Sequence, residues 1–563
     1  MKKNIFLTTI FFFVLMLMSV ATAQAQQDDY MAALRAYLQA RPSVMSTFDR
    51  DKLISSLEPL NNQVLLGFDS EKLKDIVQKY REEQFYEDFV ESVFLPGYKP
   101  NVSISELEQL TSMMQSPEGQ QYESHTILAW KKMEENPDER IQFMSKATDA
   151  MRTGRMPQDL KKRKDIPKKY AELFYENIDM ASINDMLSPL LNVLNLQKAD
   201  DEQKKMREAI FQYVTRNMGT LMLNFSYGIL TEEDLIFQGR LLRTEAAQHV
   251  MVATKHLMGN IFQSTQDWMS KYVEWLVKQK PVCDFSLQKA VDAMNVAAIG
   301  VELEDAIDDT KFSSKLEDEM FVMEVSDDSI VEGGVEGLPV SSREIIKSSF
   351  YYSTLTQSKD FLHSLVYSGR KFVIRLTGSN GERAVDMAVE NSQLKKILDD
   401  FDTYHSVFEA LNLLGDNNYD EALPILKAAA EKGNQRACYE LGKIYYDGIV
   451  VNEDFDEAMR YFKQAAELDD ELLFKSESFS NIALILLTNN SYEEALTAVD
   501  AAIAVIPDEA SCYEVKGFIL LAKGDKQGAK QMWEKVVSLE PDYTETHPNN
   551  LSQLLSGKGK GRK

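Results

Sequence analysis

Cysteine and histidine are scarce in this sequence. Its 563 residues include only three cysteines, Cys283, Cys438 and Cys512, and six histidines. An odd number of widely spaced cysteines excludes a disulfide framework, so the fold must be stabilised by packing. With so few histidines, there is little choice of ligands for a transition-metal site.

Motifs of nucleotide-binding and hydrolytic enzymes are also absent. The sequence has no Gly-rich phosphate loop, no G-x-S-x-G, no H-E-x-x-H and no paired C-x-x-C. His249 and His256 share one face of a predicted helix and could hold a metal ion, but no third ligand is spaced to join them. Cys283 could be a nucleophile if His363 or His405 lay beside it, but a structural thiol is the simpler interpretation.

Two acidic clusters could bind calcium through carboxylate oxygens: Asp305 with Asp308 and Asp309, and Asp327 with Asp328. Neither has the spacing that wraps a chain around the ion, so solvated turns are the favoured interpretation. We therefore predict no catalytic residue, no metal, no cofactor and no enzymatic activity.

Positive charge is in deficit, because 62 Lys and Arg stand against 88 Asp and Glu, a formal net charge of −26. Such a surface repels phosphate backbones, which argues against nucleic-acid binding. Two basic clusters, at 161–169 and 558–563, run against this trend. We interpret them as a solvated linker and tail, and docking on an acidic partner is the alternative.

A long apolar run occurs only at the N-terminus. Lys2 and Lys3 precede an apolar run over residues 5–20 and the small-residue pattern Ala21-Thr22-Ala23-Gln24-Ala25. This arrangement predicts a Sec-type signal peptide over residues 1–25. An uncleaved anchor is the weaker alternative, because about 20 apolar residues are needed to span a bilayer. No lipoprotein cysteine follows, so we expect a periplasmic or secreted protein without a membrane span in the mature chain.

Residues 28–276 have a helical pattern that contains a duplication. The segments 103–107 and 116–120 recur 128 residues later, at 231–235 and 244–248. In each copy a Ser or Thr stands three residues before an acidic residue, the capping-box arrangement that opens a helix.

These residues resemble the DUF2059 family of exported bacterial helical domains, whose hallmark is an acidic helix start followed by an aromatic-x-Ser-Pro-x-Gly step. Copy one keeps Ser116-Pro117-Glu118-Gly119 but has Met114 where an aromatic residue is usual, and copy two has lost both Pro and Gly. The resemblance implies two small helical bundles of unknown activity, over residues 26–155 and 165–280. A basic hinge, 152–169, is predicted between them.

Residues 281–400 are predicted to form a small α+β domain. Apolar, β-branched segments predict strands over 319–326, 371–377 and 383–389, the last two flanking a hairpin turn at 378–381. Helices are predicted over 286–295 and 341–368.

From residue 405 the pattern has a fixed period. Ala483, Ala495 and Pro507 recur 34 residues later as Gly517, Ala529 and Pro541. This is the tetratricopeptide (TPR) period, in which small residues lie where antiparallel helices cross. Leu441-Gly442, Tyr445, Gly448, Asp454 and Ala458 resemble a Sel1 repeat, a TPR variant. About four helical hairpins are predicted over residues 405–543, before a basic tail, 544–563. The predicted fold class is thus mainly α, with two helical bundles, one α+β domain and a C-terminal α-solenoid.

The first helices of stacked hairpins line a concave groove. The predicted groove residues are Arg436, Tyr439, Lys443, Tyr446, Glu514 and Phe518. Aromatic and basic side chains there could hold a peptide, although the array could instead pack this face on the α+β domain. We therefore predict a non-enzymatic adaptor for a protein or peptide partner and leave its oligomeric state open. The alternatives are an enzyme or small-molecule binder with a site in 281–400, and a chaperone-like holdase that uses the Met-rich helical region.

Overall fold

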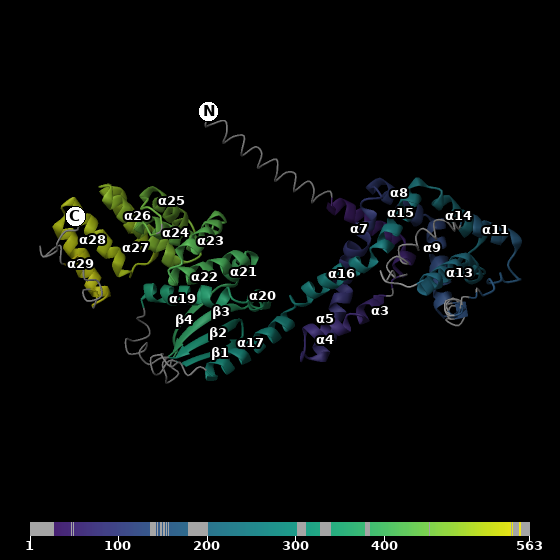
Figure 1. The fold of residues 1–563 in the computed structure, drawn as a ribbon, viewed down its shortest axis with the longest axis horizontal. Coiled ribbons are helices and arrows are strands. Elements are labelled where there is room, and N and C mark those ends of the chain that lie inside the picture. The colour runs from purple at the N-terminus through teal and green to yellow at the C-terminus, as the bar shows by residue number, and fades with distance from the viewer. Residues whose placement is uncertain are drawn as a thin grey trace, which may run out of the picture. The chain divides into compact units, whose positions relative to one another are not determined.

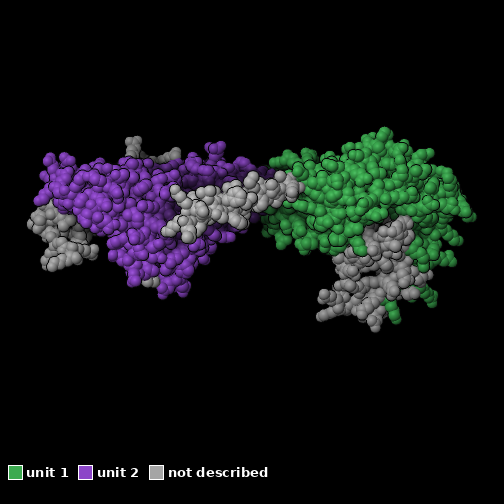
Figure 2. All heavy atoms as spheres, turned by 90° about the horizontal axis from the view of Figure 1, so that it is seen from above, with its two compact units in different colours: residues 1–276 green, residues 277–563 purple. Residues whose placement is uncertain are grey.

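The computed structural model describes residues 27–135, 157–177, 201–300, 311–326, 339–377 and 383–541, apart from positions 47, 49 and 450, with single positions between 142 and 155 and after 541. The predicted signal peptide, both acidic clusters that were considered for calcium and interpreted as solvated turns, and nearly all of the basic tail lie outside these residues. The chain divides into two compact units, unit 1 (residues 1–276) and unit 2 (residues 277–563) (Figure 2). As predicted, the fold is mainly α-helical, with a small sheet and a C-terminal helical array. The predicted domain limits within each unit remain predictions.

Unit 1 is helical throughout nearly all of its described part (Figure 1). Residues 27–40 are helical. The later helices are α2 (Pro42–Ser46), α3 (Arg50–Ser55), α4 (Glu58–Val64), α5 (Ser70–Glu83), α6 (Phe85–Phe89), η1 (Val90–Phe94), α7 (Leu95–Tyr98), α8 (Ile104–Gln115), α9 (Pro117–Glu135), α11 (Lys168–Asn177), α13 (Asp201–Ser226), α14 (Glu232–Leu242), α15 (Glu245–Gly259) and α16 (Ile261–Leu276). In the part of the chain that the structure describes, every helix is too short or too polar to cross a membrane.

The two repeated segments of unit 1 begin with the same capping box. At the start of α8, Ser103 Oγ accepts a hydrogen bond from the backbone N–H of Glu106, and the Glu106 carboxylate accepts one from the N–H of Ser103. Thr231 and Asp234 make the same reciprocal pair at the start of α14. Each pair satisfies N–H groups that the first turn of a helix leaves without partners.

The next helix in each segment also begins alike. Ser116 Oγ accepts a hydrogen bond from the N–H of Gly119, and Thr244 Oγ1 accepts one from the N–H of Ala247, both at 3.1 Å. A Cβ at position 119 would collide with the backbone of Met113, which explains the glycine of copy one. Copy two accommodates Ala247 at the equivalent place.

A buried tyrosine supports each capping box from outside its helix. The Tyr30 hydroxyl donates to the carbonyl of Val102 at 2.9 Å, and the Tyr170 hydroxyl donates to the carbonyl of Leu230 at 3.0 Å. Both carbonyls belong to the residue just before the capping Ser or Thr. The two segments therefore share a local structure as well as a sequence pattern.

The described part of the predicted hinge is bonded to α13. The N–H of Leu160 donates to Asn217 Oδ1 at 2.7 Å, and the N–H of Arg163 donates to Asn224 Oδ1 at 3.1 Å. These bonds fix the backbone around residues 160–163 on one face of that helix.

The two segments pack crosswise, α8 against α15 and α14 against α9. His125 Nδ1 on α9 lies 2.7 Å from Asp234 Oδ2, and His249 Nδ1 on α15 lies 2.5 Å from Glu106 Oε1. The carboxylate that caps one segment is therefore paired with a histidine of the other. Local capping and the packing between the segments depend on the same two acidic side chains.

The pKa of the Asp234 carboxyl lies below its usual value. Burial alone would raise this pKa, but hydrogen bonds from Thr231 and His125 outweigh burial. A carboxyl with a lowered folded-state pKa stabilises the fold above its unfolded pKa of about 4, and the contribution is lost as the pH falls through the folded pKa.

We therefore expect Asp234→Asn to loosen the packing of α9 on α14 at pH 7 by about 1–3 kcal/mol, because a buried charged acceptor is lost. Hydrogen exchange read by mass spectrometry should be faster in both helices, and the difference from the unmodified protein should shrink near pH 3. The matched control is Asp69→Asn, because Asp69 is exposed and caps its own helix through Glu71 and Lys72. Equal effects of the two substitutions on α9 and α14 would contradict this account.

Unit 2 contains a four-stranded sheet and the helical array. Its elements are α17 (Lys280–Gly300), β1 (Lys311–Glu317), β2 (Met320–Ser326), α19 (Val340–Leu355), α20 (Lys359–Ser368), β3 (Lys371–Thr377), β4 (Arg383–Val389), α21 (Asn391–Asp399), α22 (Phe401–Gly415), α23 (Tyr419–Glu431), α24 (Gln435–Asp447), α25 (Phe455–Ala466), α26 (Leu472–Thr488), α27 (Tyr492–Val505), α28 (Ala510–Lys523) and α29 (Lys526–Leu539).

The sheet has the order β1-β2-β3-β4, with β2 and β3 parallel and the outer pairs antiparallel. The last three strands match the predicted ones, whereas β1 was not predicted. Phe321, Phe372 and Ile374 belong to the core, where α17 and α20 pack on the sheet (Figure 1). The predicted hairpin turn at 378–381 lies outside the described residues.

The single helix predicted over 341–368 is wrong, because the structure has two helices there, α19 and α20. Ser358 starts the second one, since its hydroxyl accepts a hydrogen bond from the N–H of Phe361 at 3.3 Å. A helix-capping serine therefore interrupts an otherwise continuous helical pattern.

The array consists of four consecutive helix pairs within residues 401–539, all of which are described except position 450. Ala483 and Ala495 are fully buried where α26 meets α27, and Ala529 is fully buried one period later. At Gly442 a Cβ would lie 2.6 Å from the Phe462 ring. Small residues thus allow the helices of a pair to approach closely.

Candidate functional site

Helix α24 presents the central part of the predicted groove. Asn434 caps this helix by accepting a hydrogen bond from the N–H of Ala437 at 3.0 Å. Positions 436, 439, 440 and 443 then share one face, because residues three or four apart are neighbours on a helix.

Three of the predicted groove residues form one cluster on this face. The Arg436 guanidinium lies 3.9 Å from the centre of the Phe474 ring on α26, and its Nη2 lies 2.7 Å from Glu440 Oε1. The Tyr439 ring is 5.0 Å from that of Phe474. Lys443 Nζ is 5.5 Å from the centre of the Tyr439 ring, and the Lys443 side chain is 47% exposed. These cation–π and ion-pair contacts hold the cluster together.

Two carboxyl groups, of Glu440 and Glu477, face the two cations of the cluster. Burial raises the pKa of the Glu477 carboxyl, although Tyr439, Arg436 and Lys443 oppose the rise. Burial, followed by the nearby Glu477, raises the pKa of the Tyr439 hydroxyl. Lys443 is the most exposed cation of the cluster, so it is the group best placed to meet a partner.

The other three predicted groove residues lie outside this cluster. The Tyr446 ring packs on a ring of α25, 5.5 Å away. Glu514 accepts hydrogen bonds from the Tyr543 hydroxyl at 3.0 Å and from the N–H of Leu551 at 2.8 Å, so it binds the C-terminal residues. Phe518 is half-buried on α28.

Helix α19 lies between the sheet and the array and packs against α22 and α26, two first helices of the repeats (Figure 1). Asp508, which lies just before α28, holds the N-terminus of α19. Its Oδ2 accepts a hydrogen bond from the N–H of Val340 at 2.5 Å, and its Oδ1 accepts one from the N–H of Ser341 at 3.0 Å. Beyond its C-terminus, the carbonyl of Thr356 lies 2.8 Å from His405 Nδ1. The α+β domain therefore covers part of the face formed by the first helices. Packing of this face on the α+β domain was the predicted alternative to a free peptide-binding groove.

Glu471, just before α26, connects helix α19 with the cluster on α24. Burial raises the pKa of Glu471 to about 7, opposed by a hydrogen bond from Ser348 of α19 and by the charge of Arg436. Sequence reasoning missed both acidic residues, because the α19 partners of Asp508 lie 167 and 168 residues away. No local pattern marks such a pair.

Asp508→Ala is expected to release the first turn of α19 at a cost of about 1–3 kcal/mol, since two charge-assisted hydrogen bonds are lost. Hydrogen exchange of residues 340–345 should rise about tenfold for each 1.4 kcal/mol lost. Asp525→Ala is the control, because Asp525 caps α29 through the N–H of Gly528. Unchanged exchange at 340–345 in Asp508→Ala would show that Asp508 does not hold α19.

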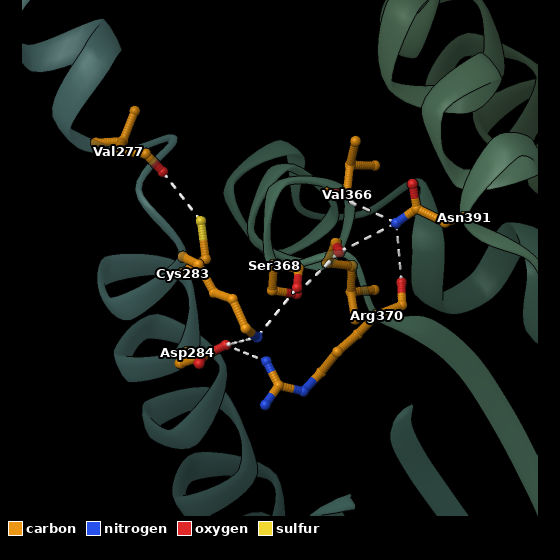
Figure 3. Close-up of polar contacts among 9 residues, drawn as sticks. Val277, Cys283, Asp284, Val366, Ser368, Arg370 and Asn391 are labelled. Carbon is orange, nitrogen blue, oxygen red and sulfur yellow. Dashed lines mark hydrogen bonds and ion pairs between the residues drawn. The ribbon is translucent and has the colours of Figure 1, made fainter. Parts of the chain in front are cut away.

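Cys283 is a structural thiol. Its side chain is 1% exposed, and its Sγ donates to the carbonyl of Val277 at 3.2 Å (Figure 3). Burial, with the nearby charge of Asp284, raises the pKa of the thiol to about 12. A thiolate is therefore scarce near neutral pH, which argues against a nucleophile.

The polar groups beside Cys283 join α17 to the end of α20. Lys280 Nζ donates to Asp284 at 3.3 Å and to the carbonyl of Ser368 at 3.2 Å, while Arg370 pairs with Asp284 (Figure 3). Asn391 Nδ2 donates to the carbonyl of Arg370 at 3.1 Å. The Lys280–Asp284 contact lies within α17, and the other contacts tie one element to another, so the cluster has a structural role.

The histidines considered as catalytic or metal-binding residues have other contacts. His363 packs on Tyr367 with the rings tilted and their centres 4.4 Å apart. His405 contacts Thr356, and His249 is paired with Glu106. Within the described ranges, no group of three or more His, Cys, Asp and Glu could hold a metal ion.

The stacked helix pairs α22–α29 define the class of this part of the chain, an α-solenoid of helical repeats. Residues 435–470, which span α24 and α25, match the Sel1 repeat. The Sel1 resemblance predicted from the sequence is thereby confirmed.

Low-identity relatives agree with this class. The chain is 26% identical over 149 residues to the photosystem I assembly protein Ycf3 of Prochlorococcus marinus (strain MIT 9215). The matched region covers 22% of this chain and 83% of that protein. It is also 28% identical over 115 residues to Ycf3 of Synechococcus sp. (strain CC9311). This match covers 17% of this chain and 66% of that protein. These TPR-type relatives support a repeat protein, and such repeats indicate protein–protein interaction.

Proposed function

We propose that this protein is an exported, non-enzymatic adaptor that holds a polypeptide partner on its Sel1/TPR-like array. The observation that carries the proposal is the cluster of Arg436, Tyr439 and Lys443 on a first helix of the array. Aromatic and cationic side chains at the edge of a packed surface are typical of binding hot spots. The buried part of the cluster fixes the shape of the surface. Lys443 supplies an exposed positive charge, and its Nζ lies 3.7 Å from Glu440 Oε2.

The partner segment that fits this cluster carries a carboxylate for Lys443. A carboxylate would gain a charge-assisted contact with the ammonium group. The rings of Tyr439 and Phe474 are buried 5.0 Å apart, so they fix the place of Lys443 and do not themselves meet the partner.

Export and the role of unit 1 are further parts of the proposal. The charged and apolar pattern of residues 1–25 supports a periplasmic or secreted location. The shared caps at Ser103 and Thr231 support two DUF2059-like copies. The name of the Ycf3 relatives assigns them an assembly role, and an assembly role would suit an adaptor of this class.

Point variants test the array better than its deletion, because the array and the sheet share one hydrophobic core. The partner is first identified by capture with the tagged mature chain from its native host, and its Kd is then measured by calorimetry. Lys443→Glu should weaken binding about tenfold or more, because an attraction becomes a repulsion.

Lys463→Glu is the matched control, since it makes the same charge change at an exposed position of the second helix α25. Its Kd should stay within about twofold of the unmodified value. Equal Kd values for both variants and the unmodified chain would remove the α24 cluster from the binding site.

A further inference from the structure

Unit 1 contains two cavities that adjoin the same two residues, Arg41 and Val44. The first has a volume of about 270 Å³ and lies among α9, α11, α13 and α14. The second has a volume of about 310 Å³ and lies among α7, α8, α14 and α15. Both volumes are near the lower end of the range of small-molecule pockets.

Equivalent faces of the two repeated segments line these cavities. Thr126, Ala129 and Trp130 of α9 line the first cavity, and the residues 128 positions later, Thr254, Leu257 and Met258 of α15, line the second. The two cavities therefore occupy equivalent places in the two repeated segments. Their linings differ in the residues at several equivalent positions.

The first cavity is the more polar of the two. Gln238 and Ser226 line it where the second cavity has Leu110 and Tyr98 at the equivalent positions. A small, mostly apolar space with a few placed polar groups is the usual form of a small-molecule site.

A buried ion pair stands at the wall of the first cavity. Arg41 Nε lies 3.1 Å from Glu123 Oε2, and the exposed fractions of the two side chains are 18% and 5%. Glu123 Oε1 also accepts the N–H of Ser43 at 2.5 Å. Position 251, equivalent to 123, is Met251, so copy two has no such acid at this place.

The pair determines which ligand the cavity suits. Glu123 holds Arg41 Nε, and Arg41 lines the cavity with 18% of its side chain exposed. The charges of Arg41 and Glu123 cancel, so a charged ligand group would be buried without compensation. A neutral acceptor could bond to the exposed part of the Arg41 guanidinium without that cost.

We infer that the first cavity binds a neutral small molecule with an aromatic or other apolar body and a hydrogen-bond acceptor, such as a carbonyl, directed at Arg41. The aromatic ring of Trp130 and the apolar side chains of Met133 and Phe225 surround the apolar body. This site lies in unit 1 and does not depend on the adaptor role of the array.

Titration of the full mature chain with prodan, a neutral fluorescent naphthyl ketone, tests the proposal. Binding should be saturable and should quench tryptophan emission, because Trp130 lines the cavity. Neutral 2-acetylnaphthalene should displace prodan at a concentration about tenfold or more below that of anionic 2-naphthoate, since the anion would be buried without a counter-charge. The absence of saturable binding, or equal displacement by the anion, would overturn the proposal.

Two variants test whether prodan binds in the first cavity. Each replaces a residue of the cavity with the residue found at the equivalent position of copy two. Ala129→Leu fills the cavity with the residue found at Leu257, and Trp130→Met removes the aromatic wall as at Met258. Each should weaken prodan binding about tenfold, since one or more methylenes or a ring contact is at stake. Leu128→Phe, on an adjacent exposed position, should leave binding unchanged. Unmodified binding by both cavity variants, in chains whose hydrogen exchange shows them folded, would place the probe elsewhere and overturn the site.

Discussion

Close approach of helices at small side chains is the constraint on which unit 2 depends. Gly442 faces the Phe462 ring at a distance that leaves no room for a Cβ, and Ala458 and Ala465 are fully buried on the facing helix α25. This approach aligns α24 with its neighbours, so that the first helices form one continuous face. Helix α19 packs on that face, and the Arg436 cluster lies on it.

Features set by local sequence were predictable. The period of small residues and proline gave the array, and apolar β-branched runs gave β2, β3 and β4. Strand β1 was missed because it is polar, with Phe312 and Leu316 as its only large apolar residues. Its pairing with β2 determines it. The position of α19 was not predictable either, because Asp508 and Glu471 act through partners far along the chain.

Unit 1 shows the same division between local and long-range information. The capping boxes at Ser103 and Thr231 follow from four-residue patterns, but their pairing with His249 and His125 requires the fold. Duplication also allows divergence: one copy has Glu123 beside the more polar cavity, and the other has Met251 beside the more apolar one. A pair of similar segments can thus provide both a mutual scaffold and a single specialised site.

The central claim, that close helix crossings shape the face which carries α19, is tested most directly by comparing Gly442→Ala with Gly415→Ala. A Cβ at 442 meets the Phe462 ring, whereas one at 415 meets nothing within 4 Å. Hydrogen exchange of the full chain should rise in α24, α25 and α19 for Gly442→Ala, at a cost of about 1–3 kcal/mol, and should stay unchanged for Gly415→Ala. Unchanged exchange in all three helices of Gly442→Ala would contradict the account.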